Sequence, residues 1–390
     1  MKINEVEVSG FKGISNLVIR PKQINIIVGK NNTGKTSILE AIHCTLGVDI
    51  FKMQRKYYPH VANLININKK ESKVLVKLED KNYYLLLTRP ELKEILPEFK
   101  KELLNKLKSI APKTTDKSES WKKAEKILDK ILSKDELLSE LENESIRIES
   151  SGKKLNLFSY TQLILKEIEP LLDYVDKEIF QERFGRGMLS SLFTIRFPHF
   201  VHNKKEENPL SIINNLALEE SLILSQSKSK INKIQNYLQD RKILKNLERF
   251  DFDKLLFKQE GKEYEIPYSF MGDGFKSLVG LISRTSEENK IVLIEEPETR
   301  MHPAYMREVI CQIINFSKIN NMQFFVTTHS SDLLDIILTD TLEPKYAEYL
   351  SKELNVIRLD YLGGDIIAQE LNMEEAKEEL EELKIDLRGK

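Results

Sequence analysis

The chain has 390 residues, 41% of them hydrophobic and 31% charged, and its acids and bases cancel to a formal net charge of −1. A globular chain of this length forms roughly two or three domains, and its charge balance excludes a polycation that coats nucleic acid indiscriminately. Two cysteines, Cys44 and Cys311, without a C-x-x-C pair argue against zinc, and no apolar run approaches the roughly 20 residues that cross a bilayer, so we expect a cytoplasmic protein without a membrane partner.

The first ninety residues have the pattern of strands around one helix. The expected strands are residues 3–8, 14–19, 24–28, 73–79 and 82–88. The first two and the last two are short alternating runs joined by tight turns, which predicts two antiparallel hairpins. The run at 24–28 is apolar throughout and predicts a buried strand, followed by a helix that ends near Gly47.

A glycine-rich loop joins that buried strand to the helix. Gly29-Lys30-Asn31-Asn32-Thr33-Gly34-Lys35-Thr36 fits G-x-x-x-x-G-K-[ST] at every fixed position. Such a loop closes its backbone N–H groups around phosphates, its lysine reaches the β- and γ-phosphates, and its hydroxyl holds Mg²⁺. The sequence therefore predicts a nucleotide site. Its candidate residues are Gly29, Asn31, Asn32, Thr33, Gly34, Lys35, Thr36 and Ser37.

Residues 91–250 have a different character, that of long charged helices. Apolar residues recur at helical spacing over 121–132 and 163–180, and a third helical stretch is expected from about 210 to 247. Between Lys100 and Lys134 there are eleven lysines and five acids. Such helices could neutralise nucleic-acid phosphates, or they could simply be solvated faces, since few aromatic residues interleave with the lysines.

After this insertion the sequence returns to strands. We expect a hairpin from 253–257 and 262–266, a helix at 277–282, and buried strands at 291–294 and 323–326. The first buried strand runs into Glu295-Glu296, where one carboxylate can position Mg²⁺ and the other can orient or deprotonate a water. The second runs towards His329, whose imidazole could donate to the γ-phosphate or to that water at the same sheet edge.

The last part of the chain is expected to hold one strand and one acidic helix. The strand covers residues 355–361. The acidic helix is expected to bear Glu370, Glu374, Glu375, Glu378, Glu379, Glu381 and Glu382.

Three segments together resemble the ABC-class ATPases of the RecF/SMC/OLD type. They are the loop and helix at 25–42, the run 294–303 (Ile-Glu-Glu-Pro-Glu-Thr-Arg-Met-His-Pro), and Thr327-Thr328-His329-Ser330. The resemblance implies an α/β fold, an ABC-type ATPase head whose mixed sheet carries the phosphate-binding core and an antiparallel β-layer, with a helical insertion. The expected parts are 1–90 and 251–340 for the head, 91–250 for the insertion, and 341–390 for a C-terminal strand and acidic helix.

The resemblance also implies roles for individual residues. Lys35, Glu296 and His329 would be catalytic, while Thr36 and Glu295 would hold Mg²⁺ with ATP. Lys12 would lie near the nucleotide, and Glu298 and His302 would belong to the D-loop. In this family two heads sandwich ATP, so a homodimer or higher homo-oligomer is expected. The signature segment in trans would be Met271, Gly272, Asp273 and Gly274, with Met271 where a serine is usual.

Two hypotheses for the biological role follow from the resemblance. Full OLD nucleases carry a Toprim domain after the switch histidine, and only about sixty residues follow His329 here. The first hypothesis is therefore a stand-alone ATPase of a prokaryotic defence module, similar to those of the PARIS and Septu systems, with a separately encoded nuclease or toxin effector. The alternative is a RecF-like ATPase that binds DNA in repair or recombination.

Overall fold

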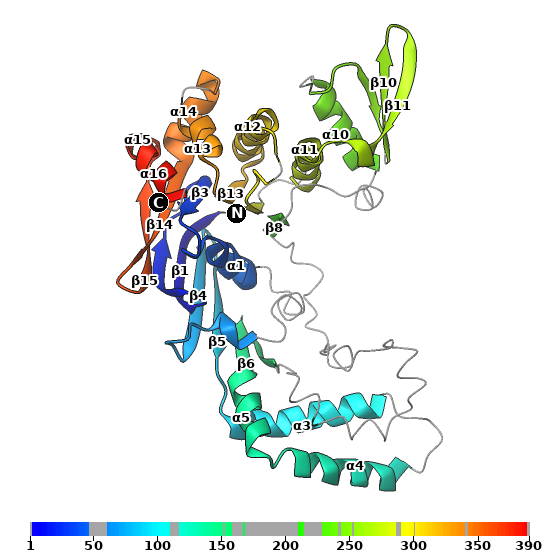
Figure 1. The fold of residues 1–390 in the computed structure, drawn as a ribbon, viewed down its shortest axis with the longest axis vertical. Coiled ribbons are helices and arrows are strands. Elements are labelled where there is room, and N and C mark those ends of the chain that lie inside the picture. The colour runs from blue at the N-terminus through cyan, green and yellow to red at the C-terminus, as the bar shows by residue number, and fades with distance from the viewer. Residues whose placement is uncertain are drawn as a thin grey trace.

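The computed structural model describes most of the chain. The described residues are 2–46, 61–109, 117–150, 153–157, 167, 210–213, 228–240, 243–251, 253–285, 290–299, 301–339 and 342–387. Within these ranges the strands form three sheets, and helices cover them (Figure 1).

The central sheet is the mixed sheet that the sequence predicts. Its order is β15-β14-β3-β13-β12-β8, and every pair is parallel except β14 with β15. The strands are β3 (Ile24–Gly29), β8 (Leu210–Ile213), β12 (Ile291–Glu295), β13 (Gln323–Thr327), β14 (Leu354–Leu362) and β15 (Asp365–Leu371). Thr327 pairs with both Glu295 and Ile27, so β12, β13 and β3 end at one edge of the sheet.

The antiparallel layer has the order β2-β1-β4-β5-β6-β7. Its strands are β1 (Ile3–Phe11), β2 (Ile14–Ile19), β4 (Glu71–Leu78), β5 (Asn82–Thr88), β6 (Ile146–Ser150) and β7 (Lys153–Leu157). Both hairpins expected in the first ninety residues are confirmed. A small third sheet, β11-β10-β9, contains the expected hairpin of β10 (Lys254–Gln259) and β11 (Lys262–Pro267), with β9 (Leu247–Phe250) beside it.

The helices fall into three groups along the chain. The first group lies beside the antiparallel layer or in the insertion and comprises α1 (Lys35–Leu46), α3 (Leu92–Ser109), α4 (Lys117–Ile131), α5 (Asp135–Glu144) and α10 (Lys228–Asp240). Around the central sheet lie α11 (Asp273–Arg284), α12 (Pro303–Asn320), α13 (Ser331–Leu338) and α14 (Pro344–Glu353). The tail holds α15 (Met373–Glu378) and α16 (Leu380–Leu387), and short 3₁₀ turns occur at Val61–Leu64 and Tyr268–Phe270.

Alternate residues of the central strands face two different hydrophobic cores. Ile24, Ile26 and Val28 of β3 pack in the core that contains α11 to α14, whereas Ile27 packs in the core of α1 and the antiparallel layer. This is the pattern of a strand that is buried on both faces. The apolar run before the phosphate loop is thus held between two layers, which fixes the position of the loop.

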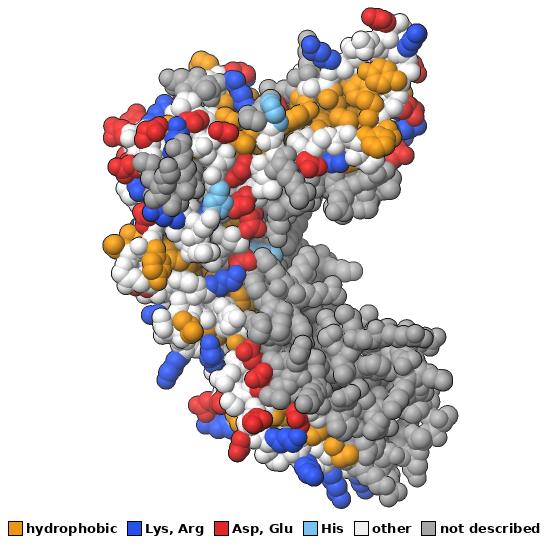
Figure 2. Space-filling view, in the orientation of Figure 1, with side chains coloured by type: hydrophobic (Ala, Val, Ile, Leu, Met, Phe, Trp, Pro, Cys, Tyr) orange, Lys and Arg blue, Asp and Glu red, His pale blue; other side chains and the backbone are white. Residues whose placement is uncertain are grey.

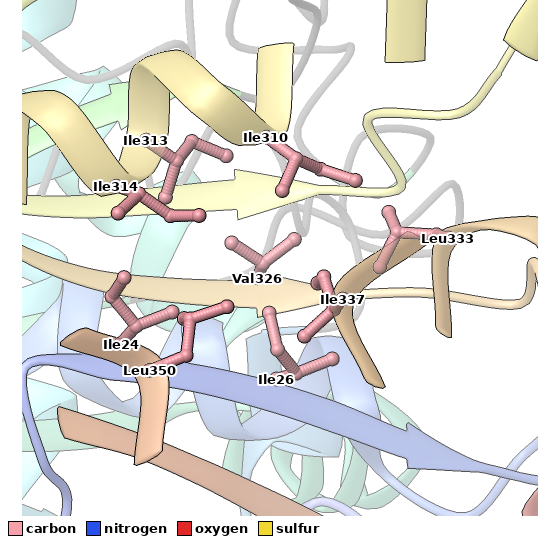
Figure 3. A pocket seen from close by; sticks show the side chains of 9 residues that line it. All are labelled: Ile24, Ile26, Ile310, Ile313, Ile314, Val326, Leu333, Ile337 and Leu350. Atoms are coloured by element: carbon pink, nitrogen blue, oxygen red, sulfur yellow. The ribbon is translucent and has the colours of Figure 1, made fainter. Parts of the chain in front are cut away.

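A small gap remains between the central sheet and α12, α13 and α14 (Figure 3). It is lined by nine apolar residues: Ile24, Ile26, Ile310, Ile313, Ile314, Val326, Leu333, Ile337 and Leu350. The volume that the centre of a water-sized sphere can occupy in the gap is ≈ 10 Å³. The gap therefore has room for about one water molecule. Because its lining offers no polar side chain, it is a packing gap and not a ligand site.

The insertion is less helical than the sequence predicts. Strands β6 and β7 extend the antiparallel layer, and β9 also falls within 91–250. The prediction of a helix over 210–247 is wrong at both ends. The segment begins with strand β8, and among its described residues only α10 is helical. The helix expected over 163–180 lies outside the described residues apart from Glu167.

The tail also differs from its expectation. It contains two strands, and Glu370 lies in β15 and not in the acidic helix. The remaining acidic residues lie in two short helices, α15 and α16, and at the junction between them. β15 forms because it pairs with β14 along its whole length, from Leu371 opposite Val356 to Asp365 opposite Leu362. The division of the chain into four parts stays a prediction.

The described elements spread along the long axis of the molecule (Figure 1). Helices α3, α4 and α5 lie at one end, the β10–β11 hairpin lies at the other, and the central sheet lies between them. Within the described ranges, none of the helices combines the length and apolar character needed to cross a lipid bilayer.

Candidate nucleotide site

The glycine-rich loop has a backbone that only certain residues can adopt. Gly29 has φ 150° and Gly34 has φ 87°, both in the region that favours glycine. A Cβ on Gly29 would collide with the carbonyl of Leu359 and lie 2.7 Å from Thr33 Oγ1, and one on Gly34 would lie 2.9 Å from Ile366 Cδ1. Thr33 closes the loop by donating from its hydroxyl to the Lys30 carbonyl at 2.9 Å. Asn31 and Asn32 are exposed at its tip.

Lys35 is buried inside this loop at the first residue of α1. Its Nζ donates to the carbonyl oxygens of Gly29 and Lys30, each at 2.7 Å. Burial lowers the pKa of Lys35 to about 8, and attraction to Glu296 and Glu298 partly opposes that change. Charged phosphate oxygens are stronger acceptors than these carbonyls, so the amine is placed where a phosphate would attract it.

Thr36 connects the loop to the strand that carries the paired carboxylates. Its hydroxyl donates to Glu295 Oε1 at 2.6 Å, across 259 residues of sequence. Glu295 is the last residue of β12. Thr36 lies in the first turn of α1, and Ser37 follows it there. A hydroxyl and a carboxylate are hard oxygen donors, which are the ligands that Mg²⁺ uses together with phosphate oxygens and waters. The pair therefore fits the predicted metal site.

Glu296 and His329 lie opposite each other at the same sheet edge. His329 Nε2 is 2.8 Å from Glu296 Oε1, and both side chains are partly exposed, at 31% and 39%. Glu296 has φ 44°, which is unusual for a residue with a side chain, and its backbone N–H donates to the Thr327 carbonyl at 3.0 Å. The strained backbone and the hydrogen bond turn the chain sharply after β12. This turn directs the Glu296 carboxylate towards the segment after β13.

The two residues expected in the D-loop have different surroundings. Glu298 Oε1 accepts hydrogen bonds from Thr328 Oγ1 at 2.8 Å and from the backbone N–H of His329 at 2.6 Å. His302 precedes α12, and its carbonyl accepts from Tyr305 N at 2.9 Å while its side chain is exposed. Glu298 is thus hydrogen-bonded to the segment that carries His329.

Lys12 has a partner that the sequence did not suggest. Its amine forms an ion pair with the carboxylate of Glu40, a buried residue of α1. Lys12 has φ 51° in the turn between β1 and β2, and its N–H donates to the Leu64 carbonyl at 2.9 Å. The ion pair ties this turn to the helix of the phosphate loop. The one signal for it in the sequence is an acid at position 40 within the apolar face at 38, 39, 41 and 42.

The expected signature segment begins helix α11. Gly272 precedes the helix, its carbonyl accepts from Lys276 N at 3.1 Å, and a Cβ there would meet nothing within 4 Å. Gly274 packs against Tyr305, whose ring atoms would lie 3.0 Å from an added Cβ. Met271 is partly buried against the core of α11 to α14, and Asp273 is exposed. The hydrogen bonds of this segment are local.

Comparison with known proteins identifies the family of the chain. The model of the AAA ATPase domain family matches residues 1–334. The chain belongs to that family. It is an ABC-class ATPase of the RecF/SMC/OLD type, with an α/β fold. The site residues predicted from the sequence lie in the part of the chain that the family model covers.

Two relatives and one solved structure illustrate the similarity. The ATP/GTP phosphatase of Helicobacter pylori is 24% identical over 354 residues, which is 86% of this chain and 87% of that protein. Endonuclease GajA of Bacillus cereus is 24% identical over 441 aligned residues, 94% of this chain and 60% of GajA, so this chain spans less than two thirds of its length. The SMC head domain from Thermotoga maritima has a TM-score of 0.44 and 12% identity, covering 95% of this chain and 99% of that domain.

Proposed function

We propose that this ATPase hydrolyses ATP at the site formed by the ends of β3, β12 and β13. The observation that carries the proposal is the 2.8 Å contact of Glu296 with His329 beside the phosphate loop. Glu296 would orient and deprotonate the attacking water; His329 would hold Glu296 in place before the nucleotide binds and would donate its N–H to the γ-phosphate once ATP is bound. Lys35 would bind the β- and γ-phosphates from inside the loop. The backbone N–H groups around Gly29 and Gly34 would bind the remaining phosphate oxygens.

Thr36 and Glu295 would hold Mg²⁺ with the nucleotide. When bound, the metal neutralises phosphate charge that would otherwise repel the attacking oxygen. The hydrogen bond between the two side chains keeps both oxygens at the loop before any ligand arrives. Among the described residues no cluster of three or more His, Cys, Asp or Glu is suited to a metal.

We place the complete site between two copies of the chain. The N-terminus of α11 is open at Gly272, so its backbone N–H groups can approach the nucleotide of a second copy. Met271 occupies the position of the usual serine, so this contact would depend on backbone donors and on α11. The expected assembly is an ATP-dependent homodimer or a higher homo-oligomer.

The dimer is tested by mixing two inactive variants. Lys35→Ala removes the phosphate lysine, and Gly272→Trp blocks the start of α11. If each site combines Lys35 of one copy with Gly272 of the other, the mixed dimer contains one intact site and one site with both defects. Mixing should then restore up to about a quarter of wild-type turnover, since about half of the dimers are mixed and each has one good site. A mixture as inactive as its components would contradict the composite site.

We propose that ATP acts as a switch in a prokaryotic defence module with a separately encoded nuclease or toxin. The similarity to GajA, whose name describes an endonuclease, supports this role. ATP binding would assemble the heads, and release of the effector would follow a change in that equilibrium. The test is affinity purification of the chain from its native host, with and without phage infection. Recovery of no nuclease or toxin, together with unaltered phage sensitivity after deletion, would overturn the proposal.

A RecF-like role in DNA repair is supported by the lysine-rich end of the molecule. Figure 2 shows lysine side chains together with Asp and Glu side chains over α3 and α4. Lys101, Lys122, Lys126 and Lys130 are exposed there, whereas Lys100 is paired with Asp129 at 2.7 Å. Duplex DNA binding that requires ATP, and that weakens steeply with salt, would favour this role. Substituting the four exposed lysines should then reduce the salt slope.

A further inference from the structure

Glu298 binds the segment of His329 through one carboxylate oxygen. Its Oε1 accepts from Thr328 Oγ1 at 2.8 Å and from the His329 backbone N–H at 2.6 Å. Neither bond involves the imidazole. The carboxylate therefore acts on the position of the chain that carries the histidine.

The same segment is held on its other side by the strand of the phosphate loop. Thr328 is fully buried, and its N–H donates to the Ile27 carbonyl at 3.1 Å. Its hydroxyl also accepts from Ser330 N at 3.0 Å, and Ser330 then caps α13 by accepting from Leu333 N at 3.2 Å. Glu298 thus completes a frame of hydrogen bonds that runs from β3 to α13.

Among the described residues, the polar contact recorded for the imidazole is the one with the Glu296 carboxylate. His329 and Glu296 are both partly exposed, and hydrogen bonds between exposed side chains contribute little because water competes and the side chains must be ordered. Hydrogen bonds from a backbone N–H to an ionised carboxylate are stronger. The direction of His329 must therefore come mainly from its backbone.

We propose that Glu298 is a positioning residue, which fixes the backbone of His329 so that the imidazole meets the carboxylate of Glu296. This inference rests on the proposed ATP hydrolysis for its kinetic consequence. The geometric part, an imidazole held in place through Glu298, does not depend on the reaction.

The second oxygen of Glu298 allows a graded test. Glu298 Oε2 is buried and has no hydrogen-bond partner among the described residues. A glutamine would keep an acceptor oxygen at Oε1 and place a neutral amide group at the position of Oε2. An alanine would remove both. If Glu298 acts by holding the segment, the glutamine variant should recover much of what the alanine variant loses.

The kinetic experiment compares E298A, E298Q, H329A and the double variant E298A/H329A in the full chain. E298A should lower kcat by about 30- to 100-fold, because the imidazole of His329 would be displaced from its position beside the reacting groups. The KM for ATP should change less than about threefold. E298Q should lose less than about tenfold, because it keeps the acceptor. The double variant should be at most about twofold slower than H329A, because Glu298 acts mainly through His329 and only weakly through its attraction to Lys35.

Glu370 provides a matched control. Its carboxylate accepts from a backbone N–H, that of Arg20 at 3.0 Å, and from a side chain, that of Asn355 at 2.9 Å. Asn355 pairs with Asn25 near the start of β3, so these bonds lie at the end of β3 that is away from the phosphate loop. E370A should leave kcat within about twofold of wild type, since it does not touch the site.

An NMR measurement separates this inference from the proposed reaction. The chain has six histidines, and the ring signal of His329 is the one that H329A removes. In the nucleotide-free protein, E298A should shift and broaden that signal, and E370A should not. An unchanged His329 signal, additive losses in the double variant, or equal losses in E298Q and E298A would each overturn the positioning role. Absence of wild-type ATP turnover would instead overturn the proposed reaction, and the NMR result would still decide the role of Glu298.

Discussion

Thr36 donates its hydroxyl to Glu295 at 2.6 Å, so the first turn after the phosphate loop is hydrogen-bonded to the strand that ends in the paired carboxylates. Two elements that are 259 residues apart in sequence thus share one contact at the proposed metal site. The contact exists because β12 and β3 lie on either side of β13 and end together at one edge.

Removal of the Thr36 hydroxyl should weaken the use of Mg²⁺. In Thr36→Ala the Mg²⁺ concentration for half-maximal ATP turnover should rise about tenfold or more, because an oxygen at the metal site is lost and Glu295 loses its orienting partner. Thr36→Ser keeps the hydroxyl and should stay within about threefold of wild type. A Mg²⁺ titration of turnover measures both. Identical titrations for the alanine and serine variants would show that Thr36 does not serve the metal.

Glu296→Gln should separate binding from hydrolysis. It removes the proposed base, so kcat should fall by about 10²- to 10⁴-fold. ATP affinity should change little, because Lys35 and the loop backbone bind the phosphates. The control is Glu265→Gln, which changes a glutamate paired with Lys254 at 2.8 Å in the small third sheet and should leave turnover unaltered. Normal turnover in Glu296→Gln would mean that another group activates the water.

Much of this site was predictable because its chemistry restricts which residues can occupy it. A loop that closes on phosphates needs glycine where φ is positive, as at Gly34, and a lysine and hydroxyl at fixed places. Parallel strands end at one sheet edge, so Glu296 and His329 could be expected to lie near each other before their 2.8 Å contact was seen. The sequence did not reveal the Glu298 bonds, because their donors lie about 30 residues away, just after the end of β13.

The strands that the sequence missed depend on partners far along the chain. Ile146-Arg147-Ile148-Glu149 alternates, but it is short and follows charged helices, so its pairing with β5 was not evident. Glu370 lies among acidic residues that favour a helix, yet its strand forms because β14 supplies an open edge. Such tertiary pairing overrides local preference. The ion pair of Lys12 with Glu40 was hidden for a similar reason, because it needs the turn to fold onto α1.

Filling the gap in Figure 3 should stabilise the central sheet. Val326→Ile adds one methylene group at a buried position that lines the gap, a gain of up to about 0.8 kcal/mol. Val292→Ile on β12 is the matched control, because Val292 is equally buried in the same core but does not line the gap. There the extra group should cost about 1–3 kcal/mol. Chemical denaturation compares the two, and a loss of stability in Val326→Ile would show that the gap closes in solution.

Lys35 should make ATP binding depend on pH. Burial lowers its pKa to about 8 in the nucleotide-free protein, so the amine loses its charge as the pH rises through that value. A neutral amine still donates to the carbonyls of Gly29 and Lys30, but it attracts phosphate less. The Kd for ATP should therefore rise by up to about tenfold per pH unit above pH 8, measured with a fluorescent ATP analogue between about pH 7 and 9.5. In Lys35→Met, ATP binding should be weak throughout this pH range, and its Kd should not change with pH.

The stability of the nucleotide-free protein should change with pH in the opposite sense. The unfolded chain keeps Lys35 protonated up to its ordinary pKa of 10.5, whereas the folded protein releases the proton near 8. Between these values the unfolded state binds more protons, so the contribution of Lys35 to the free energy of unfolding increases as the pH rises. The measurement is the difference in unfolding free energy between wild type and Lys35→Met from about pH 7 to 10. If the free energy of unfolding of wild type does not increase relative to that of Lys35→Met as the pH rises through this window, Lys35 is not a buried amine that releases its proton near pH 8.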